Sequence, residues 1–303
     1  MAEPKVLIVT GATGHQGSAV IDALIAADDA NFHILAVTRN TTSAAANALR
    51  AKSKKISVIE GNLDDATALL NAVQAATNPQ TIWGVFSMQQ SGNSQAAAVM
   101  EEKQGQALVD ASLAAGVQHF VYASVDRNGE QPTDIPYFAS KHRLEKYLIE
   151  SAKDKPMKWT ILRPVSFMEN FDGSTGKAYA AMLRVSLKAK PIQFVATHDV
   201  GVVAARAFCD PDSFSGKTIS IAGDELTFDA LAAVYRDKVG RDVPALPGFV
   251  GRLILLSSKD LRVMFNFFAE QGYGADVTTV KAEYPGIMNF GTWLEWKASK
   301  SRK

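Results

Sequence analysis

The chain has 303 residues, of which 47% are hydrophobic and 21% are charged. This composition is typical of a globular protein and excludes a disordered chain. The 32 Lys and Arg residues nearly balance the 31 Asp and Glu residues, so the charge predicts neither nucleic acid nor an anionic membrane as a partner.

The sequence also bears on the compartment in which the protein works. Cys209 is the only cysteine, which excludes a disulfide within the chain and favours a reducing compartment. The segment Met1–Lys5 lacks the residue order of a signal peptide. No uncharged apolar run approaches the roughly 20 residues of a membrane-spanning helix. We therefore expect a cytoplasmic protein that contacts no membrane, with the nucleus as an alternative location.

The first half of the chain alternates short β-branched runs with longer amphipathic ones. We predict strands at Lys5–Thr10, His33–Thr38, Ile56–Glu60, Ile82–Ser87, His119–Ala123 and Trp159–Leu162. Helices are predicted between them at Gly17–Ala27, Thr41–Lys52, Asp65–Ala76, Gln90–Ala115 and Asp134–Lys153. Strands that alternate with helices of this length predict βαβ units, and hence an α/β fold with a doubly wound parallel sheet.

After Pro164 the regular alternation of strand and helix patterns gives way to mostly helical ones. A loop is predicted over Val165–Lys177, followed by helices at Ala178–Ala189, Asp199–Phe208, Thr227–Val239 and Lys259–Gln271, with brief strands at Ile192–Phe194 and Thr218–Ile221. A half of this kind usually supplies the substrate pocket beside a nucleotide-binding half. We predict a nucleotide-binding domain over residues 1–163. A smaller, mostly helical region for substrate or partner, interleaved with the first domain, is predicted over residues 164–303.

A glycine-rich stretch, VTGATGHQG, follows the first predicted strand. Gly11, Gly14 and Gly17 stand where a dinucleotide-binding turn needs a tight bend, a close approach of backbone to pyrophosphate, and close packing of helix on strand. The following helix N-terminus would offer unpaired N–H groups to the anion. An ordinary glycine-rich turn is the alternative, and the strand before and helix after favour the dinucleotide. Further cofactor contacts are predicted at Thr13, His15 and Gln16.

The end of the second predicted strand indicates which dinucleotide binds. Sites that prefer NAD place Asp or Glu there, whereas this chain has Arg39. A guanidinium can bind a 2′-phosphate through paired N–H bonds, so NADP(H) is the predicted cofactor. A solvated arginine at a strand end is the alternative. Asn62 and Leu63 after the third strand and Ser87 at the end of the fourth are predicted to line the rest of the cofactor.

The order of GATGHQG, TRN, GNLDD, VFSM, YASV, SKHRLEKYL and LRPVSFMENF resembles the NmrA-like branch of the atypical short-chain dehydrogenases/reductases. The resemblance covers nearly the whole chain, and the ending MNFGTWLEW is similar to the last helix of that family. It implies a Rossmann fold that binds NAD(P). It leaves two functions open, because the family resembles both NADPH-dependent reductases and catalytically silent sensors that bind NADP and a protein partner.

A candidate catalytic group lies after the fifth strand. Tyr137 and Lys141 are four residues apart, which places both on one helix face. With Asp134 as the N-cap, Tyr137 would lie at the positive end of that helix. A phenol has a reference pKa of about 10, and a nearby ammonium and a helix N-terminus both lower the pKa of a phenol. Lys141 would therefore tune Tyr137 as a proton donor and also bind the nicotinamide ribose.

Ser124 lies 13 residues before Tyr137, a spacing similar to that of short-chain dehydrogenases generally. Its hydroxyl would orient a substrate carbonyl while Tyr137 delivers the proton. Many NmrA-like regulators carry another residue in place of the tyrosine, so Tyr137 favours catalysis. The alternative is a tyrosine that simply packs against the loop of residues 165–171, with its hydroxyl in water.

That loop should cross above the nicotinamide. In the family's pattern, the backbone after the proline, here Pro164 and Val165, meets the carboxamide. A substrate wall is predicted from Phe167, Met168 and Phe171, with Asn170 as a polar contact. Core packing is the alternative for the apolar residues. The apolar helix around Met264 would be a pocket lid, a dimer face or core.

Other polar residues are assigned no chemistry. No cluster of His, Cys, Asp and Glu has metal-ligand spacing, so no metal is predicted. Asp199 is predicted to cap a helix, with His198 beside it, and Cys209 to be a small buried side chain. The sequence thus predicts a small-molecule substrate for a reductase, or a protein partner for a sensor. It leaves the substrate's identity and the oligomeric state open.

Overall fold

The computed structural model describes residues 3–27, 31–77, 80–90, 92 and 94–300. The chain forms two compact units. The first, here called the sheet unit, comprises Met1–Ser124, Ala139–Arg163 and Val200–Ile219. The second, the helical unit, comprises Val125–Phe138, Pro164–Asp199 and Ser220–Lys303.

The sheet unit is built on a seven-stranded sheet in the order β3-β2-β1-β4-β5-β6-β9. Its strands are β1 (Lys5–Val9), β2 (Phe32–Thr38), β3 (Ile56–Glu60), β4 (Ile82–Ser87), β5 (His119–Ala123), β6 (Lys158–Pro164) and β9 (Lys217–Ile221). The neighbours from β3 to β6 pair in parallel. The order reverses between β1 and β4, which is the switch point of a doubly wound sheet. The predicted α/β Rossmann fold is confirmed.

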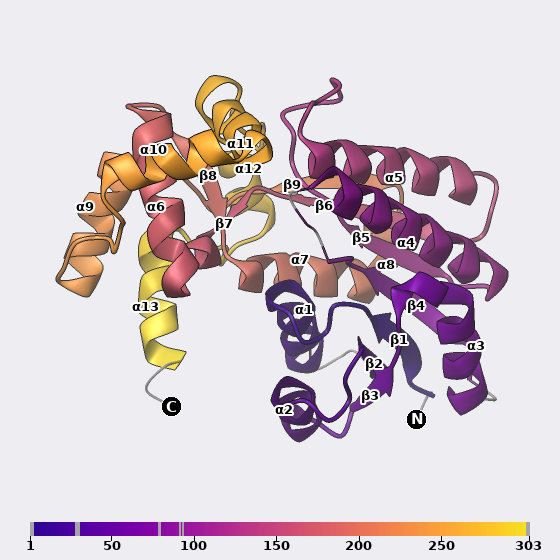
Figure 1. Cartoon of the computed structure of the whole chain (residues 1–303). Helices are drawn as coiled ribbons and strands as arrows, with labels where there is room; N and C mark the ends of the chain where they lie inside the picture. Colours follow the sequence, from indigo (N-terminus) through magenta and orange to yellow (C-terminus); the bar gives the residue numbers. More distant parts are fainter. Residues whose placement is uncertain (1–2, 28–30, 78–79, 91, 93, 301–303) are drawn as a thin grey trace. The chain divides into compact units, whose positions relative to one another are not determined.

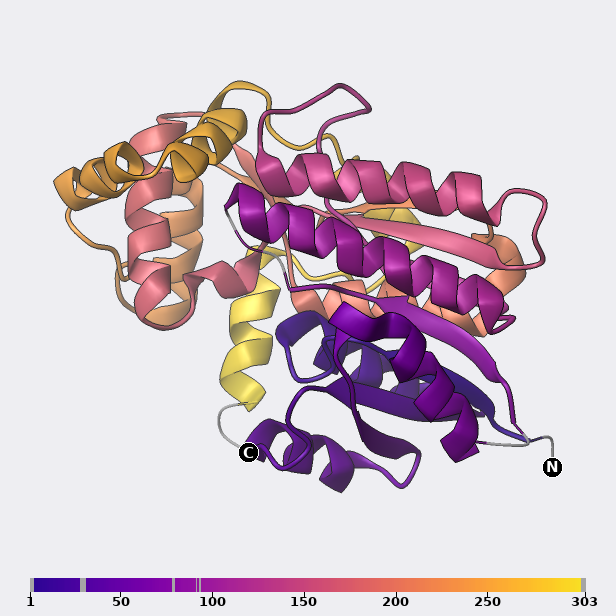
Figure 2. The ribbon, with the colours of Figure 1, turned by 45° about the vertical axis from the view of Figure 1, so that its right-hand side comes forward.

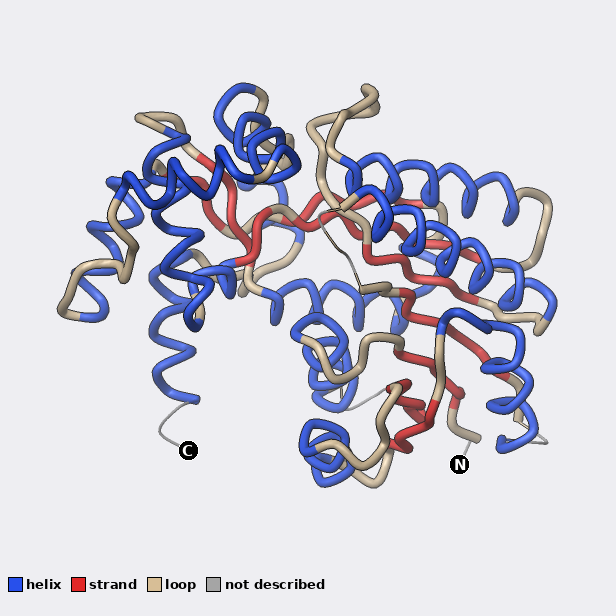
Figure 3. Tube along the Cα trace, viewed as in Figure 1, coloured by secondary structure: helices blue, strands red, loops and turns tan. Residues whose placement is uncertain are grey.

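Helices cover both faces of this sheet (Figures 1 and 3). They are α1 (His15–Ala26), α2 (Ala44–Lys52), α3 (Ala66–Thr77), α4 (Gln95–Ala114), α5 (Pro136–Ala152), α7 (Thr197–Cys209) and the short α8 (Pro211–Phe214). The side chains of α3, α4 and α5 share one apolar core with the strands, and α4 and α5 run side by side (Figure 2). Because helices cover both faces, the strands are continuous apolar runs rather than alternating ones.

The helical unit has its own small sheet, in the order β10-β8-β7. Its strands are β7 (Ser166–Phe167), β8 (Ile192–Val195) and β10 (Asp224–Leu226). A 3-10 turn, η2 (Met168–Phe171), leads into α6 (Gly173–Leu187), and α9 (Phe228–Val239), α10 (Gly248–Ser257), α11 (Lys259–Glu270), α12 (Val277–Glu283) and α13 (Phe290–Lys300) follow. None of the helices in the described residues is long and apolar enough to cross a bilayer.

Four local predictions are wrong. The segment predicted as a loop over Val165–Lys177 contains β7, η2 and the start of α6. The strand β7 pairs with β8, which is distant in the sequence, so the local residues did not indicate it. Asp134 does not cap α5, which begins at Pro136. Asp199 lies inside the first turn of α7 rather than before it. Cys209 is exposed, because α7 ends there and turns its last residue to the surface.

Asp199 instead binds the backbone of the segment that precedes α13. Its carboxylate is 2% exposed and accepts the N–H of Met288 at 2.9 Å. Burial raises the pKa of Asp199 to about 7, the N–H of Met288 opposes that rise, and the negative charge of Glu169 adds to it. The group is therefore easier to bury protonated than charged.

This pKa predicts a pH-dependent effect of Asp199→Asn. The folded-state pKa lies above the ordinary value of 3.8, so its contribution to stability is full below about pH 4 and is lost as the pH rises through about 7. Asparagine keeps the acceptor and has no charge to bury. We expect the variant to gain about 2 kcal/mol at pH 8 and little at pH 4, measured by urea denaturation.

A matched control is Asp224→Asn. That carboxylate accepts the N–H of Phe290 at 2.9 Å in the same unit but is only half-buried. It should show no such gain at pH 8. A loss of stability at pH 8 in the Asp199→Asn variant would contradict the assigned cause.

Candidate functional site in the sheet unit

The turn between β1 and α1 depends on its glycines. Gly11 has a φ of +59°, a left-handed conformation that glycine adopts without strain. The N–H of Gly14 donates to the carbonyl of Gly11 at 2.9 Å. At Gly17, a Cβ would lie 2.3 Å from the carbonyl oxygen of Gly11, so the helix lies against the turn backbone to backbone.

The substitution Gly17→Ala tests this packing. The obstructing atoms are backbone, which cannot rotate away, so we expect a loss of about 1–3 kcal/mol in the free energy of unfolding. The control is Gly248→Ala at the start of α10, where a Cβ would meet only a flexible side-chain atom of Val185 at 3.3 Å. Equal stability of the two variants in urea denaturation would show that the turn can relax.

The N-terminus of α1 is available to an anion. The helix begins at His15, and no side chain caps it from Gly14. The first turn of a helix has N–H groups that need an acceptor. Thr13 and His15 are exposed, and the Oε1 atom of Gln16 is buried with no hydrogen-bond partner in the part of the chain that the structure describes. These features fit the pyrophosphate of a dinucleotide, with the helix dipole favouring the anion.

The end of β4 lies beside this turn. The hydroxyl of Thr10 accepts the N–H of Met88 at 2.7 Å and lies 2.9 Å from the Met88 carbonyl, which ties the ends of β1 and β4 together. Ser87 is fully buried and accepts a bond from Gln89 at 2.9 Å. Among the described residues, no hydrogen-bond partner reaches the buried Oε1 atom of Gln89. Gln89 was not predicted, since nothing in the sequence separates it from its neighbour Gln90.

Arg39 lies directly after β2, exposed, with a guanidinium nitrogen 3.1 Å from Oε1 of Gln90. A neutral partner of this kind can be replaced, and a guanidinium has five N–H donors in all to offer a ligand. Asn62, after β3, is used locally: its Oδ1 accepts the N–H of Asp64 at 3.1 Å and caps the 3-10 turn η1 (Leu63–Asp65). A bond from Gln104 is the main cause that lowers the pKa of Asp64. Leu63 is half-buried against the core.

Lys141 is buried on α5 and is held by groups from α4 and β5. Its Nζ lies 2.7 Å from Oε1 of Glu101 and donates to the carbonyl of Ala123 at 3.0 Å. The side chains of Lys141 and Glu101 are 7% and 1% exposed. The ammonium also lies 5.5 Å from the ring centroid of Tyr122. A buried carboxylate therefore shares the site with the predicted catalytic lysine.

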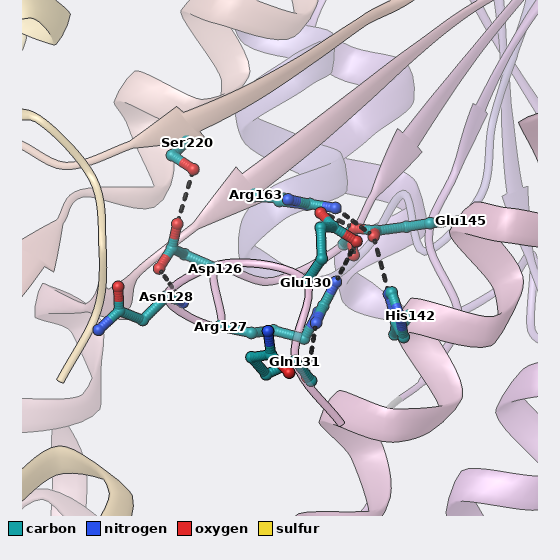
Figure 4. A network of polar contacts seen from close by, with 10 residues as sticks. Asp126, Arg127, Asn128, Glu130, Gln131, His142, Glu145, Arg163 and Ser220 are labelled. Carbon is teal, nitrogen blue, oxygen red and sulfur yellow. Dashed lines mark hydrogen bonds and ion pairs between the residues drawn. The ribbon is translucent and has the colours of Figure 1, made fainter. Parts of the chain in front are cut away.

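Ser124, at the end of β5, is bonded to another buried acid. Its hydroxyl donates to Oε1 of Glu145 at 2.5 Å. Arg163 binds both oxygens of that carboxylate, at 2.9 Å and 2.6 Å, as Figure 4 shows. His142 lies 3.8 Å from the same carboxylate. A hydroxyl has one proton to donate, so in this arrangement Ser124 offers a ligand its lone pairs.

Tyr137 belongs to the helical unit, as the second residue of α5. Its hydroxyl donates to the sulfur of Met264 at 3.2 Å, and the side chain is half-buried. A thioether is a weak acceptor that a stronger one can replace. Asp126, also in the helical unit, accepts the hydroxyl of Ser220 at 2.6 Å (Figure 4) and the N–H of Gly274 at 2.7 Å.

The loop after β6 is largely core. Met168 is fully buried, and the ring of Phe171 packs against Tyr179, Phe194 and Phe290. The N–H of Val165, which follows the buried Pro164, donates to the carbonyl of Ile221 at 3.2 Å.

Three residues of that loop remain accessible. Phe167 and Phe171 are half-buried, and Asn170 is exposed with its amide 3.4 Å from the hydroxyl of Ser166. Of the predicted substrate wall, these three residues keep surface for a ligand, whereas Met168 does not.

Sequence reasoning missed Glu101 and Glu145, the acids that hold Lys141 and Ser124. A signal for Glu101 was present. It falls at helical spacing with Ala98, Gly105 and Leu108, which form the buried face of α4. A carboxylate on the buried face of a helix needs a cationic or hydrogen-bonding partner inside the fold.

Comparisons with known proteins agree with this architecture. Residues 3–296 match the model of the NmrA-like family. An NmrA-like family domain-containing oxidoreductase of Aspergillus flavus is 25% identical over 271 residues, which cover 81% of this chain and 77% of that protein.

Two solved structures share the fold. An NADPH-dependent quinone oxidoreductase of Escherichia coli, crystallised with NADPH, superposes with a TM-score of 0.71 at 24% identity, over 96% of this chain and 98% of that one. NmrA, a negative transcriptional regulator solved with NADP, superposes with a TM-score of 0.66 at 18% identity, over 97% and 95% of the two chains. With a family match over nearly its whole length, the chain belongs to the NmrA-like family.

Proposed function

We propose that the protein is an NADPH-dependent oxidoreductase that reduces a carbonyl or conjugated double bond of a small, fairly apolar metabolite. The observation that carries the proposal is the turn between β1 and α1. It combines a left-handed Gly11, backbone contact at Gly17 and an uncapped helix N-terminus at the switch point of the sheet. Relatives named as oxidoreductases support the same reaction class.

The cofactor would lie along the carboxyl ends of the strands of the sheet unit, as in other doubly wound folds. Arg39 would bind the 2′-phosphate, which makes NADP(H) the proposed dinucleotide. The residues assigned to it are Gly11, Thr13, Gly14, His15, Gln16, Gly17, Arg39, Asn62, Leu63, Ser87 and Lys141, with the backbone of Pro164 and Val165. Bound NADPH would supply the hydride.

Three side chains would serve the reaction. Tyr137 would donate a proton to the reduced substrate, exchanging its bond to Met264 for one to the substrate oxygen. Lys141 would bind the ribose and stabilise charge near the phenol. Ser124 would turn its hydroxyl proton from Glu145 to the substrate carbonyl and so orient it. Phe167, Asn170 and Phe171 would contact the substrate at the rim.

A second function has its own support. Both Ser124 and Lys141 are bonded to buried carboxylates, Glu145 and Glu101, which weakens their action on a substrate. These contacts favour a protein that binds NADP(H) and reports its redox state to a protein partner without turnover. The structural likeness to NmrA is consistent with it.

Titration calorimetry with NADPH, NADP+ and NADH is the first test. We expect NADPH and NADP+ to bind more tightly than NADH. Absence of binding by every dinucleotide would overturn both functions. The second test follows oxidation of bound NADPH across a set of aldehydes, ketones, enones and quinones. Turnover supports the reductase. Silence, together with a partner whose affinity changes with the cofactor's redox state, supports the sensor.

A further inference from the structure

A buried ion pair joins α4 to α5 inside the sheet unit. Glu101 Oε1 and Lys141 Nζ are 2.7 Å apart, and both side chains are almost completely buried. Buried ion pairs contribute little net stability, because the desolvation of two charges offsets their attraction. A role in function is therefore a better reason for this pair than a role in stability.

The charges around Lys141 are already matched to other partners. On α4, Glu102 forms an ion pair with Arg143 of α5 at 2.7 Å. On α5, Glu145 binds Arg163 of β6 at 2.6 Å and lies near His142.

From β5, Tyr122 faces the lysine as a neutral phenol. Burial, and then the charges of Glu101, Glu145 and Glu102, raise the pKa of Tyr122. The negative charge closest to the Lys141 ammonium is therefore that of Glu101.

The number of donors on the ammonium limits what Lys141 can still bind. A lysine has three N–H bonds. One is directed to Glu101 and a second to the carbonyl of Ala123 at 3.0 Å. With the partners found in the described residues, one N–H is left for a ligand, and its direction is set by the other two bonds.

We propose that Glu101 is a positioning residue, which holds the Lys141 ammonium in place and directs its third N–H at the cofactor ribose. This inference rests on the proposed binding of NADP(H) by the sheet unit. It gives Glu101 a charge-dependent role, because a buried ammonium that loses its anion gives up its proton more readily.

The variant Glu101→Gln tests the charge while keeping the size and one acceptor oxygen. The dissociation constant of NADPH is measured between pH 7 and pH 9.5 for the variant and the wild type. We expect the ratio of the two constants to rise by about tenfold across this range, because an ammonium buried without its anion is more easily neutralised. In the wild type alone, the affinity should change little.

Three further variants show whether the effect comes from the charge of Glu101 acting on Lys141. Glu101→Asp keeps the charge but moves it, so its binding should be weaker yet no more pH-dependent than that of the wild type. It also stands in if Glu101→Gln does not fold. Glu102→Gln is the matched control from the adjacent position, where the partner is an arginine that stays charged. Lys141→Met combined with Glu101→Gln should bind weakly at every pH, with no added dependence on pH.

The outcomes separate the two proposals. If the wild type does not bind NADPH, the proposed function fails. If the wild type binds and the ratio for Glu101→Gln stays constant with pH, the role of Glu101 is overturned while the function stands. A rise of equal size in Glu102→Gln would likewise overturn the role of Glu101, because the loss of either carboxylate on α4 would then have the same effect.

Discussion

Replacing Tyr137 by phenylalanine is expected to slow NADPH-dependent turnover by about 10²–10⁴-fold, the usual contribution of a positioned proton donor. The side chain lies at the N-terminal end of α5 with its hydroxyl on the Met264 sulfur. Phenylalanine keeps the ring and its packing against Phe138 and removes only the proton. The measurement is kcat with a substrate found in the carbonyl set, together with the dissociation constant of NADPH, which should change by less than about twofold.

The control for this substitution lies on the same helix. Tyr147 is half-buried, and its hydroxyl donates to Asp110 at 2.6 Å. Tyr147→Phe likewise loses one hydroxyl and its hydrogen bond, and it should leave kcat unchanged. Wild-type turnover by Tyr137→Phe would remove Tyr137 from the mechanism, while loss of NADPH binding would show that the tyrosine serves the cofactor instead.

The second large effect concerns the choice of dinucleotide. Arg39→Asp should weaken NADPH binding by about 100-fold, because it removes charge-assisted bonds to the 2′-phosphate and adds a repelling carboxylate. NADH has a 2′-hydroxyl there, which aspartate can accept from, so its binding should fall little or improve. Calorimetric titrations of both cofactors give the ratio directly.

A charge control is needed because the substitution changes the net charge by two. Lys52→Asp makes the same change at the end of α2, where the lysine forms a surface ion pair with Asp22 at 2.6 Å. It should weaken NADPH binding by less than about threefold at physiological salt. If Arg39→Asp weakens NADPH and NADH equally, Arg39 does not bind the 2′-phosphate.

Much of the sheet unit was predictable because its signals are local. Each strand from β1 to β6 is an apolar run bounded by turn residues, and the predicted ranges agree with the observed ones to within about two residues. The strand order was not predictable, since pairing such as that of β1 with β4 joins distant segments. The glycine turn was found from its spacing, because three positions need a missing Cβ for three different reasons.

The partners of the site residues could not be predicted from single positions. Ser124 and Lys141 were found from their spacing to Tyr137, but the acids that hold them come from positions that no motif marks. Met168 was predicted as part of a pocket wall and is fully buried in the core. An apolar residue in a loop serves equally well in either place, and only the three-dimensional packing separates the two.

The exposed thiol at the end of α7 has a practical consequence. Two copies of the chain can join through Cys209 when air or peroxide oxidises them, since a surface thiol without a resolving cysteine in the same chain forms its disulfide between molecules. A dimer seen on a column run without reductant would then record the handling of the sample, and the native assembly has to be weighed with the thiol kept reduced.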